Sequence, residues 1–252
     1  PGTAGDTNLI LKLASAIGKP AFIVDPVVVD EMQDVARLSG HPDYPRRPIF
    51  HALNQKAVAK RYAAEKGVTY DSLNVIVCHM GGGISIAAHE QGWAIDANNA
   101  LDGEGPFSPE RSGTLPAADL IHLCYSGKYT KEELLKRIAG QAGLVAHLGT
   151  TNVKEMIEQI EQGDKKVELL INAMIYQVAK SIAAQGAVLC GKVDAILITG
   201  GIAYSEYIMS RLKERIGYLA PIHIYPGEDE MEALAMNALG VWRGELKMQE
   251  YV

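Results

Sequence analysis

The sequence predicts an α/β fold, in which a β-sheet is flanked by helices, and two stretches carry this prediction. Apolar β-branched residues at 75–77 enter three consecutive glycines and alternating apolar residues follow, which is typical of two strands joined by a tight turn. Later, an apolar run at 193–198 leads into a Gly-Gly turn and is followed by a helix (204–216), a strand (221–225) and a helix (228–239). Strands that alternate with helices in this way favour a parallel arrangement.

The remaining elements follow from periodicity and from residues that begin or end helices. Helices are expected where apolar residues recur every three or four positions, and strands where short apolar runs are bounded by turn residues. A long polar loop is expected at 97–115, and Thr130 with Glu133 and Asn152 with Glu155 have the spacing of capping boxes. The further expected elements are helices at 6–17, 51–66 and 165–189, and strands at 21–24 and 93–96.

Composition limits the classes of function. The chain has 252 residues, a net charge of −6 and 48% hydrophobic residues, which is ordinary for a globular protein and argues against nucleic acid as a partner. Cys78, Cys124 and Cys190 match no metal-binding spacing, so free thiols in a reducing compartment are expected. Without a signal peptide or a bilayer-spanning apolar run, we expect a cytoplasmic protein with no membrane partner. The start at Pro1 lacks methionine, so we expect it to lie inside a longer protein.

Three glycine-containing turns predict a nucleotide site: 81–83, 149–151 and 199–201. Glycine lets backbone N–H groups approach a ligand closely, and successive N–H groups form a concavity that suits a phosphate chain. His79 stands just before the first turn, where it can face a transferring phosphoryl group. Neither a P-loop nor a GxGxxG fingerprint is present, which disfavours P-loop kinases and dinucleotide dehydrogenases. A glycine-rich hairpin with a structural histidine is the alternative interpretation.

Several motifs, taken in order, resemble the acetokinase family of acetate and butyrate kinases. His79-Met80-Gly81-Gly82-Gly83 is similar to the second phosphate-binding loop of that family. Arg111 precedes Ser-Gly in a loop, 102–113, that resembles the one carrying the catalytic arginine, and Ile-Thr-Gly-Gly-Ile at 198–202 resembles the adenosine-binding turn. The features closer to the butyrate kinases of the family are the triple glycine, Asp25-Pro26-Val27-Val28 and Arg47-Pro48-Ile49-Phe50-His51-Ala52.

The resemblance covers essentially the whole chain and implies a ribonuclease H-like, actin-like ATPase fold, that of the acetate and sugar kinase superfamily, with mixed sheets flanked by helices. Residues 1–75 would then be the remainder of an N-terminal acyl-substrate domain, and 76–252 a C-terminal nucleotide-binding domain whose final helix packs back on the first. The N-terminal domain is expected to be incomplete. Family members begin with a strand and an Asn-x-Gly-Ser-rich loop, and they carry an arginine near a Gly-Gly pair. Neither feature occurs in this sequence.

The resemblance further implies ATP-dependent phosphorylation of butyrate or a similar short-chain fatty acid, with ATP/ADP and Mg²⁺ as cofactors and a homo-oligomeric assembly. A carboxylate is already ionised at pH 7 and needs no general base, so such a site has to neutralise charge and align the reactants. Two alternatives remain. One is a nucleotide-binding protein that does not catalyse, and the other is a sugar or polyol kinase of the same superfamily.

The same resemblance implies four catalytic residues. Arg111 would clamp the transition state, because its planar fork suits phosphate oxygens. His51 and His79 would face the transferring phosphoryl group, and Asp25 would orient catalytic groups or water on Mg²⁺. A structural role is the alternative for each, such as a surface arginine or a capping aspartate. The metal candidates are Asp25 and Glu230, with Asp229 as the alternative register.

The resemblance also assigns the nucleotide-binding residues. Asn152 and Lys154 stand where acetate kinases use Asp and Arg around the adenosine, so the sequence departs from the family pattern there. The candidates are His79, Gly81, Gly82, Gly83, Gly149, Thr150, Asn152, Gly200, Gly201 and Ile202.

Overall fold

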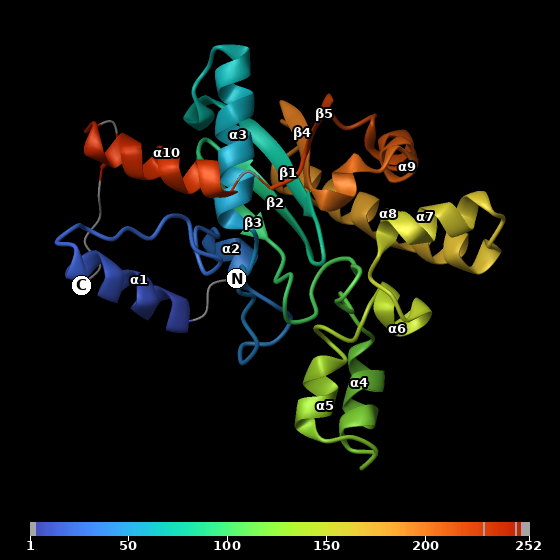
Figure 1. Ribbon diagram of the computed structural model, residues 1–252. Helices are drawn as coiled ribbons and strands as arrows, with labels where there is room; N and C mark the ends of the chain where they lie inside the picture. The colour runs from blue at the N-terminus through green and yellow to red at the C-terminus, as the bar shows by residue number, and fades with distance from the viewer. Residues whose placement is uncertain (1–3, 229, 245, 248–252) are drawn as a thin grey trace.

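The computed structural model describes residues 4–228, 230–244 and 246–247 (Figure 1). In chain order the described elements are α1 (Ala4–Ala16), α2 (Asp34–Arg37), α3 (Ala52–Lys66), η1 (Tyr70–Ser72), β1 (Asn74–Met80), β2 (Ile84–Glu90), β3 (Trp93–Ala97), α4 (Ala117–Cys124), α5 (Lys131–Lys136), α6 (Leu144–Leu148), α7 (Val153–Glu161), α8 (Lys165–Val188), β4 (Ala195–Gly200), η2 (Gly201–Tyr204), α9 (Glu206–Ile216), β5 (Ile222–Pro226) and α10 (Glu230–Trp242).

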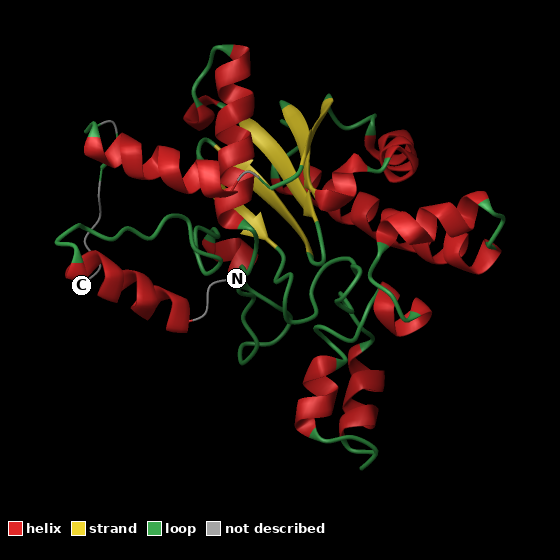
Figure 2. Ribbon diagram, in the orientation of Figure 1, coloured by secondary structure: helices red, strands yellow, loops and turns green. Residues whose placement is uncertain are grey.

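A mixed sheet of five strands, in the order β3-β2-β1-β4-β5, organises the described chain (Figure 2). β2 pairs antiparallel with β1 and with β3, whereas β4 pairs parallel with β1 and with β5. The antiparallel pairs need only short turns, but the parallel pairs need the long helical connections that follow β3 and β4. The mixed sheet flanked by helices confirms the expected fold class, with the parallel arrangement confined to β1, β4 and β5.

Alternate residues of β1 supply apolar side chains to both faces of the sheet. Ile76 and Cys78 pack in the cluster formed with α8 and α9, whereas Val75 and Val77 pack in the cluster formed with α3. This is the period of two that a strand buried on both faces requires. The sheet therefore lies between α8 and α9 on one side and α3 on the other, and α10 contacts α3 (Figure 1).

The long helix α8 is the main apolar helix of the core. Ile171, Met174, Ile175 and Val178 are fully buried and recur at helical spacing. By length and composition α8 could also cross a membrane, and it is the one helix of the described residues that passes this test. Its contacts with β1, β2 and α9 instead make it a core helix, which passes the same test.

The expected strand at 21–24 is wrong, because these residues are irregular and Ile23 is largely exposed. The run is only four residues long, and Pro20 and Pro26 bound it, so it cannot extend to make the ladder of hydrogen bonds that stabilises a strand. Asp25 follows it with a φ of +38°, which turns the chain away.

The other expected helices and strands form, with small shifts at their ends. The C-terminal helix of the βα unit begins at Glu206 rather than 204, because Ser205 caps it after the short helix η2. Thr130 makes both hydrogen bonds of a capping box. Of the two capping-box bonds expected at Asn152, the described residues show one, which its side chain accepts from the backbone N–H of Glu155 at 3.3 Å.

Candidate active site

The glycine turn between β1 and β2 leaves room for side chains from elsewhere in the fold. A Cβ atom on Gly83 would lie 2.2 Å from Nη1 of Arg111, and one on Gly82 would lie 3.4 Å from the carboxyl carbon of Glu110. Ser108 fixes this packing, because its hydroxyl donates to the Gly82 carbonyl at 2.6 Å. The long polar loop after β3 therefore folds over the glycine turn and carries Arg111 with it.

The turn at the end of β4 lies against the glycine turn for a geometric reason. β1 and β4 are parallel, with His79 opposite Thr199, so both strands end at the same edge of the sheet. Ligands of α/β sheets bind at this edge. Gly200 has a φ of +91°, and a Cβ atom there would lie 2.4 Å from the Met80 carbonyl oxygen. Glycine therefore allows the two turns to touch.

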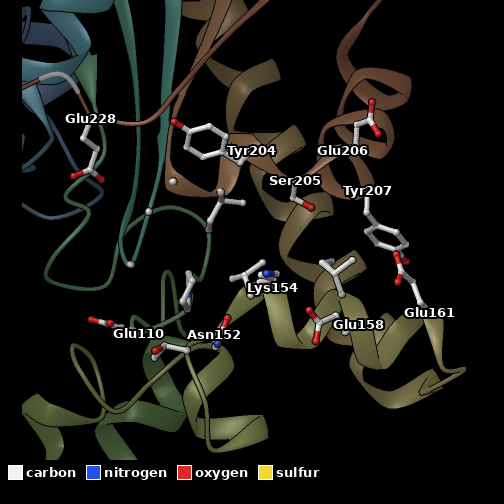
Figure 3. Close-up of a pocket in the computed structure, with 18 residues that line it drawn as sticks. Glu110, Asn152, Lys154, Glu158, Glu161, Tyr204, Ser205, Glu206, Tyr207 and Glu228 are labelled. Carbon is white, nitrogen blue, oxygen red and sulfur yellow. The ribbon is translucent and has the colours of Figure 1, made fainter.

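These turns and the start of α7 border a cavity of about 850 Å³ (Figure 3). In Figure 3, Tyr204 and Glu228 lie on the side of the sheet, and Asn152 and Lys154 lie across from them at the start of α7. The volume is within the range of small-molecule and cofactor sites. Of the predicted nucleotide-binding residues, those that line the cavity are Gly81, Gly82, Asn152, Gly201 and Ile202.

The other glycines and the threonine predicted for the nucleotide shape the loops and do not line the cavity. Gly83 faces Arg111, and Gly200 packs on the end of β1. Gly149 ends α6 in the left-handed conformation, and the Thr150 hydroxyl accepts from the backbone N–H of Asn152 at 3.1 Å. These residues hold in place the turns that reach the cavity.

His51 and His79 form a stacked pair next to the glycine turn, with ring centroids 3.8 Å apart and planes inclined by 17°. His79 is the penultimate residue of β1. Its Nε2 lies 3.2 Å from a carboxylate oxygen of Glu228, and its Nδ1 lies 2.9 Å from Oδ1 of Asn54 in α3. His51 precedes α3, and its Nδ1 lies 2.8 Å from the hydroxyl oxygen of Ser85 in β2.

Burial sets the protonation of this region. Burial, reinforced by His79 and Arg111, lowers the pKa of His51 to about 3, so its imidazole is neutral at pH 7 and carries one N–H. A hydrogen bond with His79 lowers the pKa of Glu228, which keeps that carboxylate ionised. Burial lowers the pKa of Arg111, but a guanidinium stays charged, and its Nη1 donates to the Ala100 carbonyl at 2.8 Å.

Asp25 belongs to a separate cluster of charges. Its carboxylate lies 3.5 Å from Nζ of Lys56 in α3. Lys56 also pairs with Glu31, whose other carboxylate oxygen accepts from the backbone N–H of Ala94 at 2.8 Å. The cluster joins the segment before α2 to α3 and β3, and Asp25 does not line the cavity.

Five acids that were not predicted from the sequence line the cavity: Glu110, Glu158, Glu161, Glu206 and Glu228. Of these, Glu110 and Glu228 lie beside the glycine turn, against Gly82 and Gly81. The missed signal for Glu228 is its place just after β5, at the carboxyl edge of the sheet. Glu230 begins α10 and does not line the cavity, and Asp229 lies outside the described residues. Within the described residues no group of three or more His, Cys, Asp or Glu side chains could hold a metal. Mg²⁺ needs only one or two carboxylates beside phosphates and waters, so Glu110 and Glu228, the two cavity acids beside the glycine turn, fit it.

The fold first defines a class of protein. The structure resembles acetate kinase from Porphyromonas gingivalis, with a TM-score of 0.77 and 20% identity over 86% of this chain and 63% of that one. It also resembles a propionate kinase from Francisella tularensis, with a TM-score of 0.71 and 21% identity over 80% of this chain and 59% of that one. At such identities the likeness shows the fold alone, and it confirms the actin-like ATPase fold.

The sequence then gives the family. The pattern of the acetokinase family matches residues 44–221, and the chain belongs to that family. It is 68% identical to a probable butyrate kinase from Bacteroides thetaiotaomicron, over 92% of this chain and 66% of that protein. It is 56% identical to butyrate kinase 2 from Clostridium acetobutylicum, over 95% of this chain and 67% of that protein. The chain thus spans about two thirds of the length of these relatives.

Proposed function

We propose that the protein is a butyrate kinase, which reversibly transfers the γ-phosphate of ATP to the carboxylate of butyrate or a similar short-chain fatty acid. The observation that carries the proposal is the meeting of Arg111 and the His51–His79 pair at a glycine turn that borders a nucleotide-sized cavity. Two relatives that are 68% and 56% identical and are named as butyrate kinases support the carboxylate as acceptor.

The cavity is the proposed ATP site. Backbone N–H groups of Gly81 and Gly82 would face the phosphates, since such N–H arrays bind anions. Gly201, Ile202 and Asn152 line the part of the cavity between η2 and α7, where the adenosine would lie. This arrangement points the phosphate chain toward the histidine pair at the end of β1.

In the proposed reaction a carboxylate oxygen of butyrate bonds to the γ-phosphorus while the bond from that phosphorus to the oxygen bridging the β-phosphate breaks. The electron pair of the broken bond stays on that oxygen, so ADP leaves with the negative charge on its β-phosphate. Arg111 stabilises the equatorial oxygens of the transferring group, and the His51–His79 pair faces it, with His51 as the hydrogen-bond donor and His79 stacked on its ring. Mg²⁺, when bound, would neutralise phosphate charge, and Glu110 and Glu228 would hold it.

Several finer assignments belong to this proposal. Asp25 and Glu230 remain predictions as magnesium-linked acids, although Glu228 has the stronger claim because it lines the cavity. The division into a substrate part (1–75) and a nucleotide part (76–252) also remains a prediction. Free thiols at the three cysteines support a cytoplasmic location, and the proposed assembly is a homo-oligomer.

A panel of acceptors tests the proposal. The purified protein is incubated with Mg·ATP and with butyrate, isobutyrate, acetate, glucose or glycerol, and the release of ADP is measured. The proposal predicts ADP release that depends on a short-chain acid, with butyrate or isobutyrate preferred over acetate. ADP release that depends on glucose or glycerol would instead indicate a sugar or polyol kinase.

A further inference from the structure

A chain of hydrogen-bonded side chains leads from His51 away from the cavity. Nδ1 of His51 is 2.8 Å from Oγ of Ser85, which is 2.9 Å from Nε2 of Gln55. Oε1 of Gln55 is 3.0 Å from Nε2 of His89, whose Nδ1 is 2.6 Å from the hydroxyl of Tyr70. Ser85, Gln55 and His89 are buried, and none of these partners of His51 lines the cavity.

The direction of each bond follows from which atoms can only accept. Nε2 of Gln55 also lies 3.1 Å from the backbone carbonyl oxygen of Ser85, which accepts only, so the amide nitrogen must be on that side. Oε1 of Gln55 then faces His89, and Nε2 of His89 must donate to it. Burial lowers the pKa of His89 to about 3, so its ring is neutral, Nδ1 accepts, and Tyr70 is the donor.

The same reasoning fixes the hydroxyl proton of Ser85. Its oxygen accepts from Nε2 of Gln55 at 2.9 Å and from the backbone N–H of His51 at 3.3 Å. A hydroxyl has two acceptor sites and one proton, so the proton of Ser85 is donated to Nδ1 of His51. Since His51 is neutral, its own proton lies on Nε2, at the opposite edge of the ring from Ser85.

We infer that Ser85 and Gln55, supported by His89 and Tyr70, are positioning residues that hold the proton of His51 on Nε2. All the bonds run in one direction, from Tyr70 to His51, and such chains reinforce one another in a buried environment. Together with the stacking on His79, the chain fixes both the tautomer and the orientation of the ring. The consequence for catalysis rests on the proposed function: Nε2–H is the donor presented to the transferring phosphoryl group.

Nitrogen NMR of the protein labelled with ¹⁵N-histidine tests this inference without relying on activity. The signals of His51 are assigned by their loss in His51→Gln. The native protein is expected to show His51 as the Nε2–H tautomer. Gln55→Met keeps every side-chain atom that bonds to His51 but removes the donor that orients the Ser85 hydroxyl. It should convert His51 to a mixture of tautomers, and Ser85→Ala serves the same purpose if Gln55→Met does not fold.

Ser72→Ala is the matched control, because Ser72 is exposed and its hydroxyl donates to the Thr69 carbonyl instead. It should leave the His51 signals unchanged. In kinetics, Gln55→Met should lower kcat about tenfold, the worth of one good hydrogen bond, with KM for ATP nearly unchanged. An Nδ1–H tautomer in the native protein, or an unaltered tautomer in both Gln55→Met and Ser85→Ala, would overturn the inference.

The NMR and the enzyme assay separate this inference from the proposed function. If the tautomer responds to Gln55 but no acyl phosphate forms, the inference about His51 stands and the proposed function fails. If acyl phosphate forms while the tautomer is indifferent to Gln55 and Ser85, the reverse holds.

Discussion

Gly83→Ala tests whether the glycine turn is needed to make room for Arg111. Gly83 has no positive φ, so the backbone tolerates alanine, but the new Cβ atom would lie 2.2 Å from Nη1 and 2.6 Å from Cζ of Arg111. Ordinary contact begins at 3.4 Å, so the guanidinium has to move by 3.4 − 2.2, which is 1.2 Å. A misplacement of about 1 Å costs about a hundredfold in turnover, and we expect that loss in kcat.

The fold should survive this substitution, because the clashing atoms are the end of a flexible side chain. Loss of the bond from Arg111 to the Ala100 carbonyl should lower the free energy of unfolding by about 1 kcal/mol. The assay is trapping of acyl phosphate with hydroxylamine, with urea unfolding measured in parallel. Gly186→Ala in α8 is the matched control. Among the described residues its Cβ atom would meet only the side chain of Leu219, at an ordinary contact distance of 3.6 Å, so activity should be kept.

Arg111→Ala gives the reference value. It should lower kcat by about a hundredfold or more, as expected for the loss of a transition-state hydrogen-bond donor. If Gly83→Ala acts through Arg111, adding it to Arg111→Ala should cost little more, as a double-mutant cycle would show. Wild-type turnover in Gly83→Ala, or full additivity of the two losses, would refute the reasoning.

Three further predictions concern other positions. Burial holds the pKa of both His51 and His89 at about 3 when folded, against 6.5 when unfolded, so the unfolded state binds more protons between these values. Each histidine should cost about 2 kcal/mol of stability between pH 7 and pH 5, and urea unfolding should find the fall smaller by about 2 kcal/mol in His89→Gln. Gly200→Ala adds a clash with the backbone to a positive φ and should lower the free energy of unfolding by about 3 kcal/mol or more. Gly163→Ala has a φ of +96° but nothing within 4 Å of the new Cβ atom, so it should cost only about 1 kcal/mol. Equal midpoints of urea unfolding for the two variants would contradict this. Glu228→Gln should raise the magnesium concentration for half-maximal turnover more than Glu230→Gln does, and the opposite order would favour the register read from the sequence.

The sequence was sufficient for elements whose signals are local. The helix α8 has a long apolar stripe, and the glycine turn lies between two apolar runs, so periodicity and turn chemistry identify both. The run at 21–24 looks like a strand by composition, but whether a strand forms depends on a partner, which four residues between prolines do not acquire. Local patterns therefore predict elements well and strand pairing less well.

The site divides in the same way. His79 and the glycines were recognisable because three consecutive glycines between two apolar runs are a local signal, and the motif resembles a family loop. Glu110 and Glu228 are ordinary loop acids, and only the meeting of the strand ends brings them to one cavity. The chain through Gln55 was equally hidden, because its bonds join residues 19 to 34 positions apart in sequence. The available signal was the run of three polar residues, Asn54, Gln55 and Lys56, in a helix whose other buried residues are alanines, a valine and a tyrosine, since buried polar groups need partners.

The most direct measurement of the central claim follows an oxygen atom of the substrate. Butyrate labelled with ¹⁸O in its carboxylate is incubated with the protein, Mg·ATP and hydroxylamine, which attacks the acyl carbon and releases phosphate. If the carboxylate attacks the γ-phosphorus directly, butyryl hydroxamate forms and each released phosphate carries one ¹⁸O atom. Absence of hydroxamate, or phosphate without ¹⁸O, would contradict a kinase whose acceptor is the carboxylate.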